Sequence, residues 1–318
     1  MTQAAEPAVS VVLATRDRAG RLGRALDAIE ALEVPGGFEL VVVDDASADD
    51  TPQLLARREE AWRGGPIRVI RREAPGGPAG ARNTGWRVAS ARLVAFTDDD
   101  CEPTRGWLAA LAEAAAEAPD GFVQGPTHPN PAELALRGPF SRTIEVRALG
   151  PWFPTCNVAY PRDLLERLGG FDERLPRGED TDLAWRAQEL GAAPVWAPEA
   201  LVHHAVMEIG PLGRLEVAAG WRPAFVNFAR HPSLRQHLVM GLFWKPSHAL
   251  LLLALIGAVV GRRFRPALLL ALPYARDVRL RMAREGASPE LAVYYLAHDV
   301  VEARAAIVGS VSSGTLVV

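Results

Sequence analysis

The chain has little cysteine and little net charge, and its N-terminus lacks the features of a secretion signal. Its two cysteines, Cys101 and Cys156, form no C-x-x-C pair and cannot provide a disulfide framework for 318 residues, so we expect a reducing compartment. The 35 basic and 38 acidic side chains leave a net charge of -3, which argues against a nucleic acid polymer as partner. The N-terminus carries Glu6 and no basic residue, and the apolar run 9–14 is too short for a signal peptide, which predicts a cytoplasmic protein.

The chain also lacks an uncharged apolar run of membrane-spanning length in its last third. Residues 249–260 are 12 residues without a charge; as a helix they would reach about 18 Å, against roughly 30 Å of hydrocarbon. A second apolar run, 267–275, follows Arg262, Arg263 and Arg265. We expect residues 238–284 to form a helical hairpin in peripheral contact with the inner face of the cell membrane, its arginines on anionic head groups. The alternative is a pair of buried helices in a soluble core or a dimer interface.

The first 130 residues alternate short β-branched runs with helical patterns, which is typical of an α/β sheet with mostly parallel strands. The expected strands are 9–14, 38–43, 67–70, 93–96 and 122–125, and the expected helices are 22–32, 51–62, 81–90 and 108–118. Further along we expect a strand at 153–160, a helix at 179–190 and an extended segment at 195–204.

Three carboxylates, Asp98, Asp99 and Asp100, directly follow the expected strand 93–96. Open α/β sheets bind their ligands at the carboxyl ends of parallel strands. Asp98 and Asp100 are two residues apart and can share one divalent cation, without which neighbouring carboxylates would repel each other. The alternative is that these acids cap the helix that contains Trp107. We favour the metal site because capping does not require three acids in a row.

Two other strands end in polar residues, Thr15 and Arg16 after the first and Asp44 and Asp45 after the second. Such side chains can bind a nucleobase or ribose hydroxyls, and three strand ends at one rim are stronger evidence than any one of them.

A third acidic cluster, Glu179, Asp180 and Asp182, opens the expected helix 179–190 after Gly178. Acids there complement the helix dipole, but a carboxylate on a site rim can also take a proton from an attacking hydroxyl. Downstream, His203 or His204 could join two carboxylates around Mn²⁺ or Mg²⁺, and manganese suits the imidazole nitrogen better.

These motifs, in this order from about Val9 to His204, resemble a family 2 glycosyltransferase of the GT-A fold. The segments that carry the resemblance are VVLATRDR (11–18), VVVDDAS (41–47), GARNTG (80–85), DDD (98–100), GGFDE (169–173) and GEDTDL (178–183). The resemblance implies a Rossmann-like, mostly parallel mixed sheet with helices on both faces, and a helical C-terminal extension. It implies a GT-A domain at 1–210, with a nucleotide-binding half at 1–125 and an acceptor and catalytic half at 126–210, before a helical region at 211–318.

The resemblance also implies roles for single residues. Asp180 would be the general base, and Glu179 would position the acceptor. His204 fits the family's A-x-V-x-H pattern as a metal ligand better than His203. The other implied sets are Thr15, Arg16, Asp45, Arg82, Asn83 and Asp98 around the donor nucleotide, Asp98 and Asp100 on the metal, and Thr155, Cys156, Asn157 and Asp182 near the sugar and acceptor.

The resemblance implies that the protein transfers a sugar from a nucleotide-sugar donor to an acceptor hydroxyl, with inversion and with dependence on a divalent cation. The implied acceptor is a glycan or glycolipid in cell-envelope or polysaccharide synthesis. The oligomeric state is left open. One alternative is a sugar nucleotidyltransferase, but residues 14–17, ATRD, stand where its Gly-rich phosphate loop would follow the first strand. The other is a membrane-associated scaffold that keeps a degenerate transferase fold without catalysis.

Overall fold

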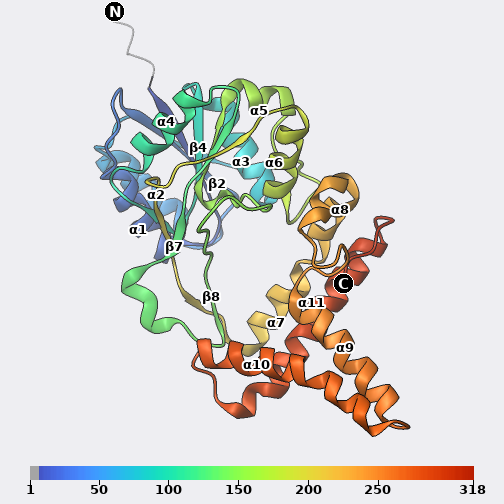
Figure 1. Cartoon of the computed structure of the whole chain (residues 1–318). Coiled ribbons are helices and arrows are strands. Elements are labelled where there is room, and N and C mark those ends of the chain that lie inside the picture. Colours follow the sequence, from blue (N-terminus) through green and yellow to red (C-terminus); the bar gives the residue numbers. More distant parts are fainter. Residues whose placement is uncertain (1–6) are drawn as a thin grey trace, which may run out of the picture. The chain divides into compact units, whose positions relative to one another are not determined.

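A computed structural model describes residues 7–318, which form two compact units (Figure 1). The first unit contains the residues up to 134 together with 143–205, and the second contains 135–142 and 206–318. The first is an α/β unit and the second is mainly helical. The predicted domain limits at residues 125 and 210 stay predictions.

The first unit is built on a seven-stranded sheet with the order β10-β6-β9-β4-β1-β2-β3. Its strands are β1 (Val9–Thr15), β2 (Phe38–Asp44), β3 (Ile67–Arg71), β4 (Leu93–Asp98), β6 (Phe122–Gln124), β9 (Val158–Pro161) and β10 (Pro194–Trp196). β1 pairs in parallel with both β2 and β4, whereas β9 runs antiparallel to β4 and β6. The almost fully buried, valine-rich runs of β1 and β2 are typical of strands covered on both faces.

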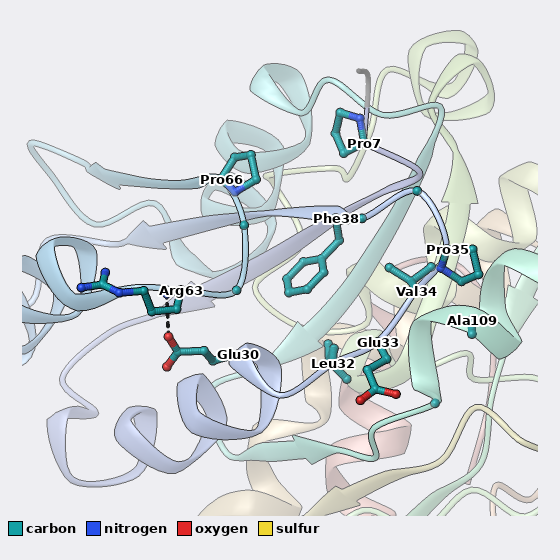
Figure 2. Close-up of a pocket in the computed structure, with 15 residues that line it drawn as sticks. Pro7, Glu30, Leu32, Glu33, Val34, Pro35, Phe38, Arg63, Pro66 and Ala109 are labelled. Atoms are coloured by element: carbon teal, nitrogen blue, oxygen red, sulfur yellow. Dashed lines mark hydrogen bonds between the residues drawn. The ribbon is translucent and has the colours of Figure 1, made fainter. Parts of the chain in front are cut away.

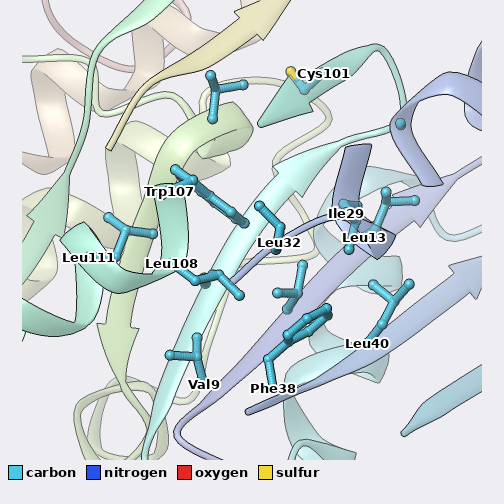
Figure 3. Packing of buried hydrophobic residues seen from close by; sticks show 14 of the residues in the cluster. Val9, Leu13, Ile29, Leu32, Phe38, Leu40, Cys101, Trp107, Leu108 and Leu111 are labelled. Atoms are coloured by element: carbon cyan, nitrogen blue, oxygen red, sulfur yellow. The ribbon is translucent and has the colours of Figure 1, made fainter. Parts of the chain in front are cut away.

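Helices cover both faces of this sheet, which confirms the predicted mostly parallel α/β fold. They are α1 (Ala19–Glu30), α2 (Thr51–Ala61), α3 (Gly77–Val88), α4 (Trp107–Glu117), α5 (Arg162–Leu168) and α6 (Glu179–Glu189). Because side chains alternate along a strand, Val9, Val11 and Leu13 pack in one core cluster. Figure 3 shows Val9 and Leu13 of this cluster with Ile29 and Trp107. Val12 packs in the second cluster, which contains residues of α3, α5 and α6.

Three segments differ from the sequence prediction. The strand expected at 153–160 begins only at Val158, because Thr155–Asn157 forms a 3-10 turn, η2, after Phe153 with a φ of 46°. α3 begins at Gly77, ahead of the predicted start at 81, because Pro78 lies in its first turn, where a missing N–H costs little. The segment expected to be extended at 195–204 divides into β10 and β11 (Val202–His204).

A smaller sheet has the strand order β5-β11-β7, and its strand β5 directly follows the acidic triplet in the sequence. Its other strands are β5 (Cys101–Pro103) and β7 (Thr127–Pro129). Asp100 is therefore followed by a strand, and α4 begins at Trp107 with Gly106 at its cap, so the helix-capping alternative for the triplet is wrong. Pairing of β11 with β5 places His204 opposite Cys101.

The second unit consists mostly of helices. They are α7 (Gly210–Gly220), α8 (Asn227–Arg230), α9 (Pro246–Gly261), α10 (Leu272–Arg284) and α11 (Ala292–Val311), with 3-10 turns η1 (Pro131–Leu136, which begins in the first unit), η3 (Arg222–Val226), η4 (Pro232–His237), η5 (Arg265–Ala271) and η6 (Pro289–Leu291). Two short strands, β8 (Ser141–Arg142) and β12 (Met207–Glu208), pair antiparallel. Among residues 7–318 no helix combines the length and apolar character needed to cross a bilayer.

Buried charges of α11 join the second unit's helices. Asp299 accepts hydrogen bonds from the Tyr274 hydroxyl at 2.8 Å and from Arg281 Nη1 at 3.0 Å. Glu302 accepts a hydrogen bond from Lys245 Nζ at 2.6 Å. Burial opposes ionisation of both carboxyls, but these partners and neighbouring histidines lower the pKa of each to about 2. Each charge is thereby compensated inside the helical unit.

Candidate active site

The carboxyl ends of β2, β1 and β4 meet at one edge of the sheet, as the sequence predicts for parallel neighbours. In register, Thr15 of β1 lies beside Asp44, and Ala14 lies beside Asp98. The Thr15 carbonyl accepts a hydrogen bond from the Asp45 amide at 2.9 Å. Polar residues that are far apart in sequence therefore share this edge.

Arg82 of α3 connects two of the acidic clusters. Its Nη2 donates to Asp98 Oδ1 and its Nη1 donates to Glu179 Oε1, both at 2.8 Å. The side chains of Arg82 and Glu179 are each 8% exposed, and that of Asp98 is 25% exposed. One buried guanidinium thus holds the end of β4 against the start of α6, with little competition from water.

Asp180 follows Glu179 in the first turn of α6, which begins after Gly178 with a φ of 80°. Glycine adopts this left-handed conformation without the steric cost of a Cβ. Asp180 Oδ1 accepts a hydrogen bond from the Thr181 amide at 2.7 Å. Burial and then the adjacent Glu179 charge raise the pKa of Asp180 to about 7, against the effects of that amide and of Arg82. A carboxyl that titrates near neutral pH is suited to exchange a proton with a substrate hydroxyl.

A carboxylate oxygen of Asp100 and a ring nitrogen of His204 face each other, and in the neutral imidazole both are hydrogen-bond acceptors. His204 Nε2 lies 3.4 Å from Asp100 Oδ1, and the two side chains are 2% and 9% exposed. His204 Nδ1 lies 2.8 Å from the Ala205 carbonyl, to which it must donate its proton. In the neutral imidazole, Nε2 then carries a lone pair directed at a carboxylate, so the contact requires a proton or a cation between them.

This pair fits a divalent cation. Asp100, His204 and the Cys101 thiol each have a ligand atom within 4.8 Å of the others. A carboxylate together with an imidazole suits Mn²⁺ better than Mg²⁺. The carboxylates at this edge also outnumber the buried guanidinium of Arg82, which favours binding of a cation. Asp98, the second predicted ligand, is not part of this group and instead pairs with Arg82.

The His203 side chain points away from the Asp100–His204 pair, because successive side chains of a strand lie on opposite faces. In the β11–β5 register it lies opposite Glu102, whereas His204 lies opposite Cys101. Burial lowers the pKa of His203, and Glu102 and His128 are the charges that act on it. The geometry favours His204 over His203 as the ligand.

Asp99 was not predicted as a site residue, yet it has one of the most perturbed carboxyls at this edge. It accepts a hydrogen bond from the Thr15 hydroxyl at 2.7 Å, and burial followed by the Asp100 charge raises its pKa to about 7. Asp99 and Asp100 form the turn between β4 and β5, and no spacing pattern in the sequence indicates that Asp99 contacts Thr15, 84 residues away.

Other predicted donor-binding residues have partners within the protein. Asp45 accepts hydrogen bonds from the amides of Gly76 and Gly77, each at 2.9 Å. Asn83 donates to the Phe171 carbonyl at 2.8 Å and accepts from its amide at 2.9 Å, which ties α3 to the turn before α6. Arg16 is 49% exposed on the rim. Their roles toward a nucleotide stay predictions.

The residues predicted near the sugar and acceptor are buried. Thr155 is 3% exposed, Cys156 and Asn157 are 0% exposed and Asp182 is 1% exposed. Asn157 Nδ2 donates to the Pro126 and Ala200 carbonyls, and Asp182 pairs with Arg186 at 2.8 Å. These contacts stabilise the backbone next to the acidic edge of the sheet. A role of these four residues toward substrate stays a prediction.

A separate open pocket of about 810 Å³ lies near the opposite edge of the sheet (Figure 2). Phe38, the first residue of β2, and Pro66, just before β3, line it together with Leu32 and Val34. These residues mark the amino ends of the strands, so the pocket is not the acidic site at their carboxyl ends.

The model of glycosyl transferase family 2 matches residues 10–169. This chain belongs to that family. The match contains β1, β2 and β4, whose ends form the edge described above, and stops before α6 and β11.

Two named relatives are similar to this chain over about three fifths of its length. A pre-mycofactocin glycosyltransferase of Mycobacterium tuberculosis (strain ATCC 25618 / H37Rv) is 32% identical over 211 residues, which covers 62% of this chain and 42% of the relative's length. The succinoglycan biosynthesis protein ExoU of Rhizobium meliloti (strain 1021) is 32% identical over 214 residues, which covers 60% of each. The chain thus spans less than half the length of the mycobacterial relative and about three fifths of the length of ExoU.

Among solved structures, the mannosyltransferase PcManGT from Pyrobaculum calidifontis, in complex with GDP-Man and Mn²⁺, has a TM-score of 0.62. It is 24% identical, and the likeness covers 97% of this chain and 87% of PcManGT. This likeness confirms the fold, in which the acidic edge and α6 belong to one α/β unit.

Proposed function

We propose that this glycosyltransferase moves a sugar from a nucleoside-diphosphate sugar to an acceptor hydroxyl, with inversion at the anomeric carbon and dependence on Mn²⁺ or Mg²⁺. The observation that carries the proposal is the buried Asp100–His204 pair, in which Nε2 and a carboxylate oxygen stand 3.4 Å apart. The complex of PcManGT with GDP-Man and Mn²⁺ supports the same class of donor and cation. A bound cation would neutralise the charge of the departing diphosphate.

In the proposed reaction the acceptor oxygen forms a bond to the anomeric carbon while the bond from that carbon to the diphosphate oxygen breaks. The electron pair leaves with the nucleoside diphosphate, and the hydroxyl proton passes to Asp180. Asp180 suits this role because its raised pKa makes its carboxylate a better base than an ordinary aspartate. Glu179, held by Arg82, would orient the acceptor.

The proposed acceptor is a hydroxyl of a glycan or glycolipid used in the cell envelope or in a polysaccharide, with the reaction at the inner face of the membrane. Two observations support it: ExoU is named for succinoglycan biosynthesis, and the second unit has a strongly apolar, arginine-bearing hairpin.

The test is release of nucleoside diphosphate from a panel of nucleotide sugars by the full chain, with Mn²⁺, Mg²⁺ or EDTA, and with water as the slow acceptor. We expect one donor to be hydrolysed with Mn²⁺ and none with EDTA. Equal hydrolysis in EDTA would contradict the metal dependence, and no hydrolysis or binding of any donor by folded protein would contradict the transfer reaction.

A further inference from the structure

Residues 246–276 of the second unit contain α9, η5 and the start of α10, and are called the α9–η5 hairpin below. This hairpin exposes large apolar side chains on several sides. Val259, Phe264, Leu269 and Leu272 are each between 61% and 65% exposed. Other large apolar residues of the same hairpin that are more than two-fifths exposed are Leu252, Leu255, Ile256, Val260 and Leu268. Scattered exposed leucines are ordinary on proteins, but a contiguous group of this kind marks an interaction surface.

Glycines at the seam explain why these side chains face outward. A Cβ on Gly257 would lie 2.7 Å from the Ala267 carbonyl oxygen, and one on Gly261 would lie 2.5 Å from Leu268 Cδ2. α9 and η5 therefore approach closely at these two glycines, where a side chain on α9 would collide with Ala267 or Leu268. In Figure 1, α9 leads away from α8 to the turn at 262–264, and η5 returns along it.

The charges on the hairpin have one sign. Between residues 246 and 276 the sequence has no aspartate or glutamate, while Arg262, Arg263, Arg265 and Arg276 are all exposed. The three arginines at the turn make no ion pair with any residue of 7–318. An anionic partner is therefore favoured. Two copies of this surface placed face to face would bring these arginines together, which disfavours a symmetric dimer.

We propose that the α9–η5 hairpin docks this protein on an anionic lipid leaflet. Val259, Phe264, Leu269 and Leu272 enter the boundary between head groups and acyl chains, and the arginines at the turn bind lipid phosphates. The hairpin is too short to cross the bilayer and lies along its surface. The inference deepens the proposed site of action, but it rests on the hairpin alone and is tested without turnover.

The experiment is flotation of the full chain, without detergent, with vesicles of phosphatidylcholine alone or mixed with phosphatidylglycerol. Two variants alter the hairpin: Arg262→Ala/Arg263→Ala/Arg265→Ala removes the charges, and Val259→Ser/Phe264→Ser/Leu269→Ser removes apolar contacts. Matched controls change exposed residues of the first unit: Arg57→Ala/Arg92→Ala/Arg105→Ala and Leu134→Ser/Leu190→Ser.

We expect binding to the anionic vesicles that weakens with salt. The arginine variant should partition roughly 100-fold less, since each surface arginine contributes about fivefold. The apolar variant should also be released, and the control variants should bind like wild type. The proposal is overturned if folded wild type does not bind the anionic vesicles. It is also overturned if light scattering shows that wild type is a dimer and that the apolar variant is a monomer, because the apolar surface would then be a subunit interface. Equal binding of the arginine variant overturns the phosphate contact. Donor binding, measured on the same variants, shows separately whether the α/β site is intact.

Discussion

Asp180→Asn is expected to lower kcat by roughly 10³-fold, because the amide cannot accept the proton of the acceptor hydroxyl. The substitution keeps the size of the side chain and the oxygen that accepts from the Thr181 amide. Binding of the donor nucleotide should therefore change little. The measurement is steady-state transfer or donor hydrolysis, together with calorimetric binding of the donor.

The pH dependence gives this prediction a second readout. Only ionised Asp180 accepts a proton, so with its pKa raised to about 7 the wild-type kcat/KM should rise with pH up to about 7 and level off above it. Asp180→Asn should remove this rising limb. If the limb persisted in the variant, Asp99, whose pKa is also about 7, would be its source. Asp163→Asn, at an exposed position of α5, is the matched control, and an Asp180→Asn enzyme within tenfold of wild type would rule out the base.

Arg82→Ala is expected to lower the free energy of unfolding by about 3–5 kcal/mol, since it leaves Asp98 and Glu179 without their shared buried cation. It should also move the rising limb of kcat/KM to higher pH, because the Arg82 charge lowers the pKa of Asp180. Urea unfolding followed by tryptophan fluorescence measures the first effect, and the pH profile measures the second.

Arg87→Ala is the control for Arg82, because Arg87 lies on the same helix and is 51% exposed. It makes a long ion pair of 3.7 Å with Glu173 and a cation–π contact with Trp86 at 5.4 Å from the ring centre, and neither contact joins the two acidic clusters. It should cost less than about 1 kcal/mol. The double variant Arg82→Ala/Glu179→Gln should recover part of the stability by removing one uncompensated charge. A loss below about 1 kcal/mol in Arg82→Ala would mean that the buried bridge does not hold the two clusters together.

The sheet and its acidic edge could be predicted from the sequence because they depend on local patterns. Continuous valine-rich runs identify β1 and β2, and the carboxyl ends of parallel neighbours necessarily share an edge. That rule brings Thr15, Asp45 and Asp98 together without any knowledge of packing. The acids that open α6 were found for the same reason, as a helix-start pattern.

What the sequence could not give depends on contacts between distant segments. Arg82 lies 16 residues from Asp98 and 97 from Glu179, and no spacing rule indicates that it bridges them. β5 is a three-residue strand that contains proline, too short to show alternation, so the segment after Asp100 resembled a helix start. Asn157 is the last residue of a 3-10 turn where a continuous strand was expected, and its side-chain amide donates to two carbonyls inside the protein.

Metal-dependent binding of a nucleotide at the Asp100–His204 pair is tested by calorimetric titration of wild type and Asp100→Ala. The ligands are nucleoside diphosphates and nucleotide sugars, each with Mn²⁺ and with EDTA. Asp100 lies 3.4 Å from His204 Nε2, so the variant removes one of the two oppositely placed acceptors. We expect wild type to bind one nucleotide with Mn²⁺ only, and Asp100→Ala, still folded, to lose this binding. Equal binding in EDTA, or by Asp100→Ala, would contradict it.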